Sequence, residues 1–202
     1  MKVGVLASGA GTNLQAILDR VHGREGVDVV AVGTDKPGAE ALARARSAGV
    51  ETQTFAREAY SDRAARDAAM ADWLAAHGAE LVVLAGYMQL VSPGFLDRFA
   101  AGVINVHPAL LPAFPGLRAI EQTLEYGVKV AGVTVHYVDT GVDTGPIIAQ
   151  RAIELAGALD PAALRAALRP VEHDLLCEAV LAIGRGGVRI DPDHPRRVLV
   201  GS

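Results

Sequence analysis

The stretch Val103-Ile104-Asn105-Val106-His107-Pro108-Ala109-Leu110-Leu111-Pro112 decides how the rest of this chain is interpreted. A short apolar run ends in two polar residues, and the prolines prevent the backbone from continuing as strand or helix. Residues i and i+2 of a strand share a face, so Asn105 and His107 are predicted to project together at the strand's C-terminal end, where open α/β sheets bind ligands. An amide beside an imidazole can hold the oxygen of a carbonyl under attack. A core histidine and a capping asparagine would explain the same pair.

Composition limits the class of protein. The chain has 202 residues, of which 50% are hydrophobic, and a formal net charge of −4. This indicates one globular domain and argues against a nucleic-acid binder that works through bulk positive charge. We find neither a membrane-spanning apolar run nor a secretory signal, so we expect a cytoplasmic protein. The single cysteine, Cys177, excludes an internal disulfide and is predicted to pack in the core.

The order of apolar segments predicts the fold class. In the first half, short strands alternate with helical stretches, with strands expected at 3–7, 27–32, 51–55 and 81–85. This pattern predicts an α/β fold with a Rossmann-like, mostly parallel sheet flanked by helices. In the second half, 132–138 alternates and 146–153 is apolar, which predicts an antiparallel strand pair. A long helix is expected over 160–184, followed by a short strand and a frayed end.

A glycine-containing turn follows the first expected strand. Ser8-Gly9-Ala10-Gly11-Thr12-Asn13-Leu14-Gln15 runs into a helical pattern, and a helix N-terminus after a glycine turn is suited to bind an anion. Leu14 stands where the dinucleotide-binding fingerprint requires a glycine, and no Gly-Lys-Ser/Thr of a P-loop follows. The turn is therefore predicted to hold a single phosphate, with a purely structural turn as the alternative.

Four motifs in the same order resemble the glycinamide ribonucleotide formyltransferases, a folate-dependent formyltransferase family of purine synthesis. They are the turn 8–15, Ala85-Gly86-Tyr87-Met88, Asn105-Val106-His107-Pro108 with Leu110-Leu111-Pro112, and 132–136 through Asp143-Thr144-Gly145-Pro146. The resemblance covers nearly the whole chain. It implies the formyltransferase fold, 10-formyltetrahydrofolate as formyl donor and co-substrate, glycinamide ribonucleotide as acceptor, no metal, and a monomer or homodimer.

The resemblance also assigns roles residue by residue. It implies a catalytic trio of Asn105, His107 and Asp143. The residues implied to bind the ribonucleotide are Gly11, Thr12, Asn13, Pro108 and Glu172. Those implied to bind the folate are Arg63, Met88, Gln89, Leu90, Val138, Asp139, Thr140, Gly141 and Val142. His136 and Thr134 match the strand that leads to the catalytic loop. One formyltransferase domain is expected over 1–190, with a phosphate- and nucleotide-binding half at 1–100, a catalytic and folate-binding half at 101–190, and a tail at 191–202.

This chain departs from the family pattern at three positions. Gln89 stands where an arginine is common, Ala113 where several relatives have a lysine, and Thr140 where an acid is usual. None of these positions belongs to the trio, so we expect altered folate affinity rather than lost chemistry.

Formyl transfer explains the types of residue in the trio. An amine attacks the formyl carbon, and the tetrahedral intermediate carries a negative oxygen that Asn105 and His107 can stabilise. Asp143 can hold His107 protonated or relay the amine proton toward the folate nitrogen. A nearby carboxylate is expected to raise the pKa of His107, and burial is expected to raise the pKa of Asp143.

Other interpretations of these residues stay open. Asp143 could be a turn residue, because aspartate is common beside glycine in loops. His107, His136 and Asp143 could together bind a metal. A formate-releasing hydrolase or a transferase for charged tRNA is disfavoured, because both are expected to carry an additional domain. A non-catalytic phosphate-binding module would leave the trio without a role.

Overall fold

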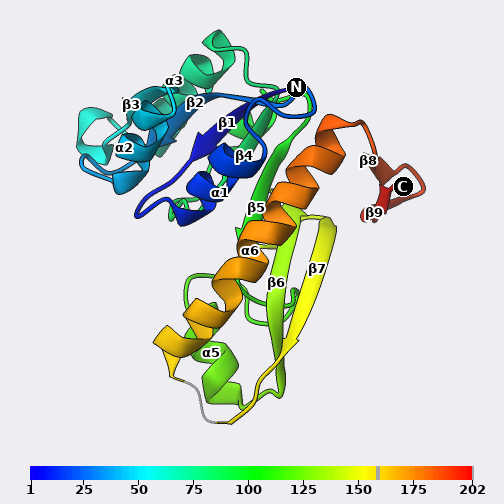
Figure 1. Ribbon diagram of the computed structural model, residues 1–202. Coiled ribbons are helices and arrows are strands. Elements are labelled where there is room, and N and C mark those ends of the chain that lie inside the picture. Colours follow the sequence, from blue (N-terminus) through cyan, green and yellow to red (C-terminus); the bar gives the residue numbers. More distant parts are fainter. Residues whose placement is uncertain (158–159, 202) are drawn as a thin grey trace.

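A nine-stranded sheet forms the centre of the protein (Figure 1), with strand order β3-β2-β1-β4-β5-β6-β7-β9-β8. The computed structural model describes residues 1–157 and 160–201. The strands are β1 (Lys2–Leu6), β2 (Asp28–Thr34), β3 (Glu51–Thr54), β4 (Leu81–Leu84), β5 (Val103–His107), β6 (Val130–Tyr137), β7 (Ile147–Glu154), β8 (Val188–Asp191) and β9 (His194–Val200). The first five run parallel. β6 is antiparallel to both β5 and β7, so the predicted mostly parallel sheet with an antiparallel pair is confirmed.

Helices cover both faces of this sheet. They are α1 (Thr12–Arg20), α2 (Glu40–Ser47), α3 (Arg63–Ala76), α4 (Pro93–Leu96), α5 (Ala119–Tyr126) and α6 (Pro161–Gly184), with a short 3-10 turn η1 (Arg57–Ala59) before α3. Side chains of α1, α2 and α6 contribute to one buried cluster against the sheet, and those of α3 and α4 contribute to a second. The central strands β1 and β4 are buried on both faces, as expected for a covered parallel sheet, whereas the edge strand β3 is polar and partly exposed.

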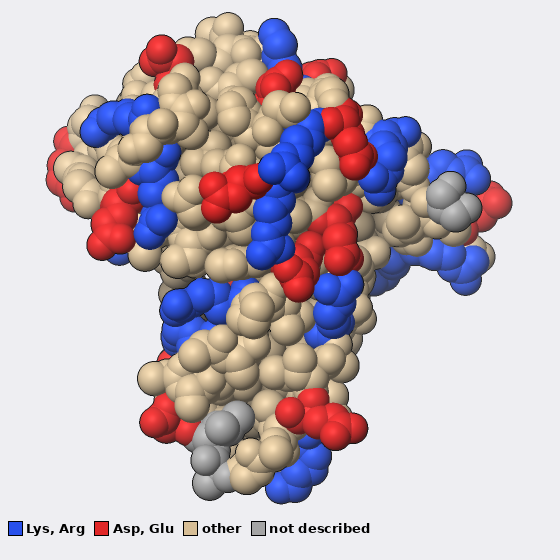
Figure 2. All heavy atoms as spheres, in the orientation of Figure 1, with Lys and Arg blue, Asp and Glu red and all other residues tan. Residues whose placement is uncertain are grey.

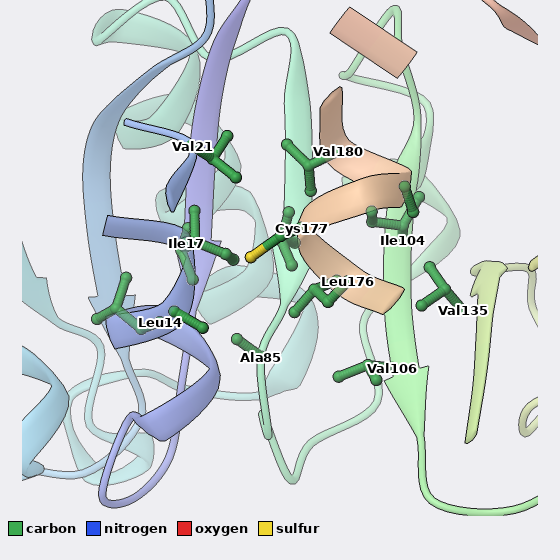
Figure 3. Close-up of a cluster of buried hydrophobic side chains, with 14 of the residues drawn as sticks. Leu14, Ile17, Val21, Ala85, Ile104, Val106, Val135, Leu176, Cys177 and Val180 are labelled. Carbon is green, nitrogen blue, oxygen red and sulfur yellow. The ribbon is translucent and has the colours of Figure 1, made fainter. Parts of the chain in front are cut away.

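Cys177 lies in the larger of these clusters. Its side chain points from α6 into the space between Ile17 of α1 and the central strands (Figure 3), and it is 4% exposed. The predicted packing role of this cysteine is confirmed. No helix in the described part of the chain has both the length and the apolar character that a membrane span requires.

The C-terminal segment differs from expectation. Instead of one short strand and a frayed end, β8 and β9 form an antiparallel hairpin, and β9 joins the sheet beside β7 through Ile147 and Arg197. The hairpin projects from the body of the molecule and carries basic side chains at the right of Figure 2. Its strands are largely exposed on both faces, so their sequence carries little burial signal. Residue 202 of the predicted tail lies outside the described residues.

Candidate active site

The predicted trio converges at the C-terminal end of β5. Asn105 and His107 project from the same face of the strand, and Asp143 reaches them from the loop between β6 and β7. His107 Nδ1 lies 3.3 Å from Asp143 Oδ2, and Asn105 Nδ2 lies 3.5 Å from Asp143 Oδ1. The His107 side chain is 5% exposed and that of Asp143 is 15% exposed. Side chains 38 positions apart in sequence thus surround one small polar space.

Asp143 is held in place by its backbone and by a neighbouring loop. Its φ of 53° lies in the left-handed region, which aspartate tolerates better than most residues. The N–H of Gly116 donates a 2.7 Å hydrogen bond to Asp143 Oδ2. The carboxylate is therefore fixed before any substrate arrives.

A second histidine orients the amide of Asn105. His136 Nδ1 lies 2.8 Å from the carbonyl of Tyr137, so Nδ1 carries a proton, and in the neutral ring Nε2 accepts. Asn105 Nδ2 donates to this Nε2 at 3.2 Å. The amide nitrogen of Asn105 consequently faces Asp143, with its second N–H in the 3.5 Å contact, which is longer than an ordinary hydrogen bond.

His107 has both ring nitrogens occupied. Nδ1 faces Asp143, and Nε2 lies 2.8 Å from the carbonyl of Phe114, whose φ is 55°. Because a carbonyl only accepts, Nε2 carries a proton, and in the neutral ring Nδ1 presents its lone pair to the carboxylate. An oxygen of a substrate can reach Nε2 only by exchanging with the Phe114 carbonyl.

The pKa shifts of this pair run opposite to the sequence-based expectation. Burial lowers the pKa of His107, and the nearby Asp143 charge and Phe114 carbonyl, which act to raise it, do not compensate. Burial acts to raise the pKa of Asp143, but the adjacent His136, the Gly116 N–H and the His107 ring together bring it below its ordinary value. Both expectations were wrong: the one for the pKa of His107 left out burial, and the one for the pKa of Asp143 left out the hydrogen bonds and charges around the carboxylate. At neutral pH the pair consists of a neutral imidazole and a carboxylate.

The turn after β5 is fixed by β6 and β7. Thr134 Oγ1 donates to the carbonyl of Ala109 at 2.7 Å and accepts the N–H of Leu111 at 3.1 Å. Gln150 Nε2 donates to the Leu111 carbonyl and to Thr134 Oγ1. Gln150 was not predicted as a site residue, because nothing in its local sequence distinguishes it from any polar position on a strand.

The predicted phosphate loop forms the start of α1. Gly11 has a φ of 70°, and a Cβ on it would lie 2.8 Å from the Cα of Ala41 in α2, so glycine is required at this position. The loop also receives a hydrogen bond that sequence reasoning missed, from Arg44 Nε to the carbonyl of Ala10 at 2.7 Å. Thr12 is half-buried and begins the helix.

Asn13 connects this loop to α6. Asn13 Nδ2 donates to Glu172 Oε2 at 3.1 Å, while the buried Oδ1 of Asn13 has no partner among the described residues. Burial raises the pKa of Glu172 despite the hydrogen bond from Asn13. The predicted ribonucleotide residues at the two ends of the sequence are thereby brought into contact, and Pro108 follows directly after β5.

The predicted folate residues lie on two loops and one helix end. Met88, Gln89 and Leu90 follow β4 and are exposed, and the segment from Val138 to Val142 follows β6. Asp139 Oδ1 accepts from Gly141 N and Thr144 Oγ1, so this carboxylate organises its own loop. Thr140 is exposed in that loop, and Arg63 is the exposed first residue of α3. No described contact joins Arg63 to either loop. Among residues 1–157 and 160–201, no cluster of three or more histidine, cysteine or acidic side chains has the geometry to hold a metal.

The sequence of this chain is similar to those of known formyl transferases. Residues 1–180 match the family model described as Formyl transferase. A protein named phosphoribosylglycinamide formyltransferase from Bacillus subtilis is 46% identical over 156 residues, covering 76% of this chain and 80% of that protein. One of the same name from Mycobacterium tuberculosis is 43% identical over 186 residues, covering 92% and 86%.

Solved structures agree with this similarity. The crystal structure of glycinamide ribonucleotide transformylase 1 from Symbiobacterium toebii superimposes with a TM-score of 0.95 at 46% identity, covering 100% of this chain and 94% of that one. The predicted family and fold are confirmed, and this chain belongs to the formyl transferase family.

Proposed function

We propose that this protein transfers the formyl group of 10-formyltetrahydrofolate to the amine of glycinamide ribonucleotide, giving formylglycinamide ribonucleotide and tetrahydrofolate. The observation that carries the proposal is the meeting of Asn105, His107 and Asp143 at the end of β5, beside a helix N-terminus suited to a phosphate. The names of the relatives at 43–46% identity support the same reaction.

The first step forms a bond between the amine nitrogen and the formyl carbon, and the carbonyl electron pair moves to oxygen. Asn105 donates to this oxyanion the N–H that now makes the long 3.5 Å contact with Asp143, and His107 donates its Nε2–H in place of the bond to Phe114. Each such donor in a preorganised site commonly lowers the barrier by about 2.7–4 kcal/mol.

Asp143 accepts the proton that the attacking nitrogen loses. Its carboxylate and the bare Nδ1 of His107 face each other across 3.3 Å, and a proton placed between them removes the repulsion of two lone pairs. The proton then passes to the folate nitrogen as the carbon–nitrogen bond to the donor breaks, which restores the pair. In this scheme His107 and Asp143 act as one proton acceptor, whose net charge goes from −1 to 0 when it takes up the proton and back to −1 when it releases it.

The two substrates are assigned to different loops around the trio. We assign the phosphate of the ribonucleotide to Gly11, Thr12 and Asn13, and its other polar groups to Pro108 and Glu172. The folate occupies the loops 88–90 and 138–142, with Arg63 near its acidic end. Exposed apolar side chains at Met88 and Leu90 support this, because a ring system would cover them.

One assay tests the proposal. Protein is mixed with glycinamide ribonucleotide and 10-formyltetrahydrofolate, and tetrahydrofolate formation is followed. Turnover that depends on the ribonucleotide is expected. Formate release without the ribonucleotide would instead identify a hydrolase, and no turnover of the folate would reject the proposal.

The cellular location and the oligomeric state of the protein belong to the same proposal. We infer that the protein works in the cytoplasm as a monomer or homodimer. Light scattering on the purified protein and fractionation of the cells that produce it test these two points.

A further inference from the structure

A buried ion pair in the first turns of α3 has no role in the mechanism above. Arg66 and Asp67 are 3% and 0% exposed, and Arg66 Nη2 lies 3.0 Å from Asp67 Oδ1. Removing two charges from water is costly, and apolar residues of similar volume often stabilise a core as well or better. The pair therefore calls for an explanation other than stability.

The second oxygen of this carboxylate holds a different segment of the chain. Asp67 Oδ2 accepts the backbone N–H of Ser92 at 2.7 Å. Ser92 directly follows the segment Gly86–Val91, here named the folate loop, which contains Met88, Gln89 and Leu90. The Ser92 hydroxyl makes no capping hydrogen bond in α4, so the contact depends on its N–H alone. A hydrogen bond to a buried charge is stronger than one between neutral groups.

The other end of the folate loop is held by the phosphate loop. Ser8 donates its N–H to the carbonyl of Gly86 at 3.2 Å, and its hydroxyl oxygen accepts the N–H of Met88 at 2.9 Å. Between these anchors the side chains of Met88 and Leu90 are 50% and 53% exposed. Tyr87 and Val91 of the same loop pack in the second buried cluster, whereas Met88 and Leu90 are half exposed. The two backbone anchors therefore set the position of this surface together with that packing.

We propose that Asp67 is a positioning residue for folate binding, which it serves by fixing the C-terminal end of the folate loop through the Ser92 N–H. Arg66 engages Oδ1 of the carboxylate and leaves Oδ2 directed at Ser92. The inference rests on the proposed role of residues 88–90 in binding the folate. Asp67 is thus a residue that contacts neither substrate and affects the binding of the folate but not that of the ribonucleotide.

Two substitutions at Ser92 separate the N–H from the side chain. Ser92→Pro removes the N–H and directs its ring Cδ at Asp67 Oδ2, so the contact is lost completely. The φ of −78° at this position is within the range of proline. Its carbonyl, which accepts from Phe95 N and Leu96 N, is retained. Ser92→Ala keeps the N–H and is the matched control. We expect Ser92→Pro to raise KM for 10-formyltetrahydrofolate about tenfold, the lower end of what a hydrogen bond to a charged group contributes. KM for the ribonucleotide and kcat stay near wild type, and Ser92→Ala resembles wild type throughout.

A rise in KM for 10-formyltetrahydrofolate without a rise in KM for the ribonucleotide distinguishes positioning from a structural role. Equal rises in both KM values, or identical kinetics of Ser92→Pro and Ser92→Ala, would overturn the inference. Asp67→Asn is the second variant, and it decides by the same difference between the two KM values if Ser92→Pro does not fold. In the double variant the two effects are expected to be less than additive, because both act on one bond. A wild-type protein without formyl transfer would instead reject the proposed function.

Discussion

Replacing Asp143 by asparagine tests the proton acceptor of the proposed mechanism. Asparagine has the same shape, tolerates the φ of 53°, and can still accept the Gly116 N–H. The variant is therefore expected to fold and to bind both substrates. What it loses is the negative charge that lies 3.3 Å from His107 Nδ1.

The distance gives the size of the expected effect. At 3.3 Å and an effective dielectric constant of about 20, a carboxylate and an imidazolium attract by about 5 kcal/mol. At roughly 1.4 kcal/mol per tenfold change in rate, losing this attraction as the proton arrives slows turnover about 10³-fold to 10⁴-fold. General acid–base groups commonly contribute about 10²-fold to 10⁴-fold, which agrees with this figure.

Two measurements check the reasoning. Steady-state assays are expected to give a kcat about 10³-fold below wild type with both KM values little changed. NMR titration of the imidazoles is expected to place the pKa of His107 lower still than in the wild type, because the Asp143 charge is one of the influences that raise it. A variant that keeps more than about a tenth of the wild-type kcat would exclude Asp143 from proton transfer.

Three further predictions concern the surroundings of the site. Glu172→Gln is expected to stabilise the protein at pH 7 but not near pH 4: the pKa of Glu172 is raised on folding, so its contribution to stability is lost as pH rises through that pKa. Thermal melts at both pH values measure this, and an equal gain at each would contradict it. Gly11→Ala is expected to cost at least about 1 kcal/mol, since φ is 70° and a Cβ would meet Ala41; a denaturant midpoint equal to that of wild type would argue against this. Burial raises the pKa of the Cys177 thiol to about 11, so we expect alkylation only in denaturant. Labelling of the folded protein would refute it.

Much of the fold could be predicted because its signals are local. The parallel half follows from short strands that alternate with helices, and α6 at Pro161–Gly184 lies within the predicted range 160–184. The hairpin of β8 and β9 could not be predicted in the same way. It buries little of either face, so its sequence lacks the alternation that would distinguish two paired strands from one strand and a loose end.

The approach of Asp143 to His107 depends on the sheet and not on the local sequence. β6 runs antiparallel to β5, so its end at Tyr137 pairs with Ile104, away from His107. The N–H of Val138 donates to the carbonyl of Val103 at that same end. The loop must therefore turn back along β5 to bring Asp143 to His107, and no motif spacing encodes that path.

The protonation state of the site depends on tertiary structure in the same way. From the sequence, a carboxylate beside an imidazole predicts a protonated His107, whereas in the fold burial outweighs that attraction and lowers the pKa of His107. In an imidazolium, Nδ1 would already carry the proton that the proposed mechanism places between His107 and Asp143. A neutral imidazole that carries its hydrogen on Nε2 offers a donor to the oxyanion on one side, and with Asp143 a proton acceptor on the other. In the proposed mechanism, the burial that lowers the pKa of His107 thus allows this histidine both to stabilise the oxyanion and to take part in proton transfer.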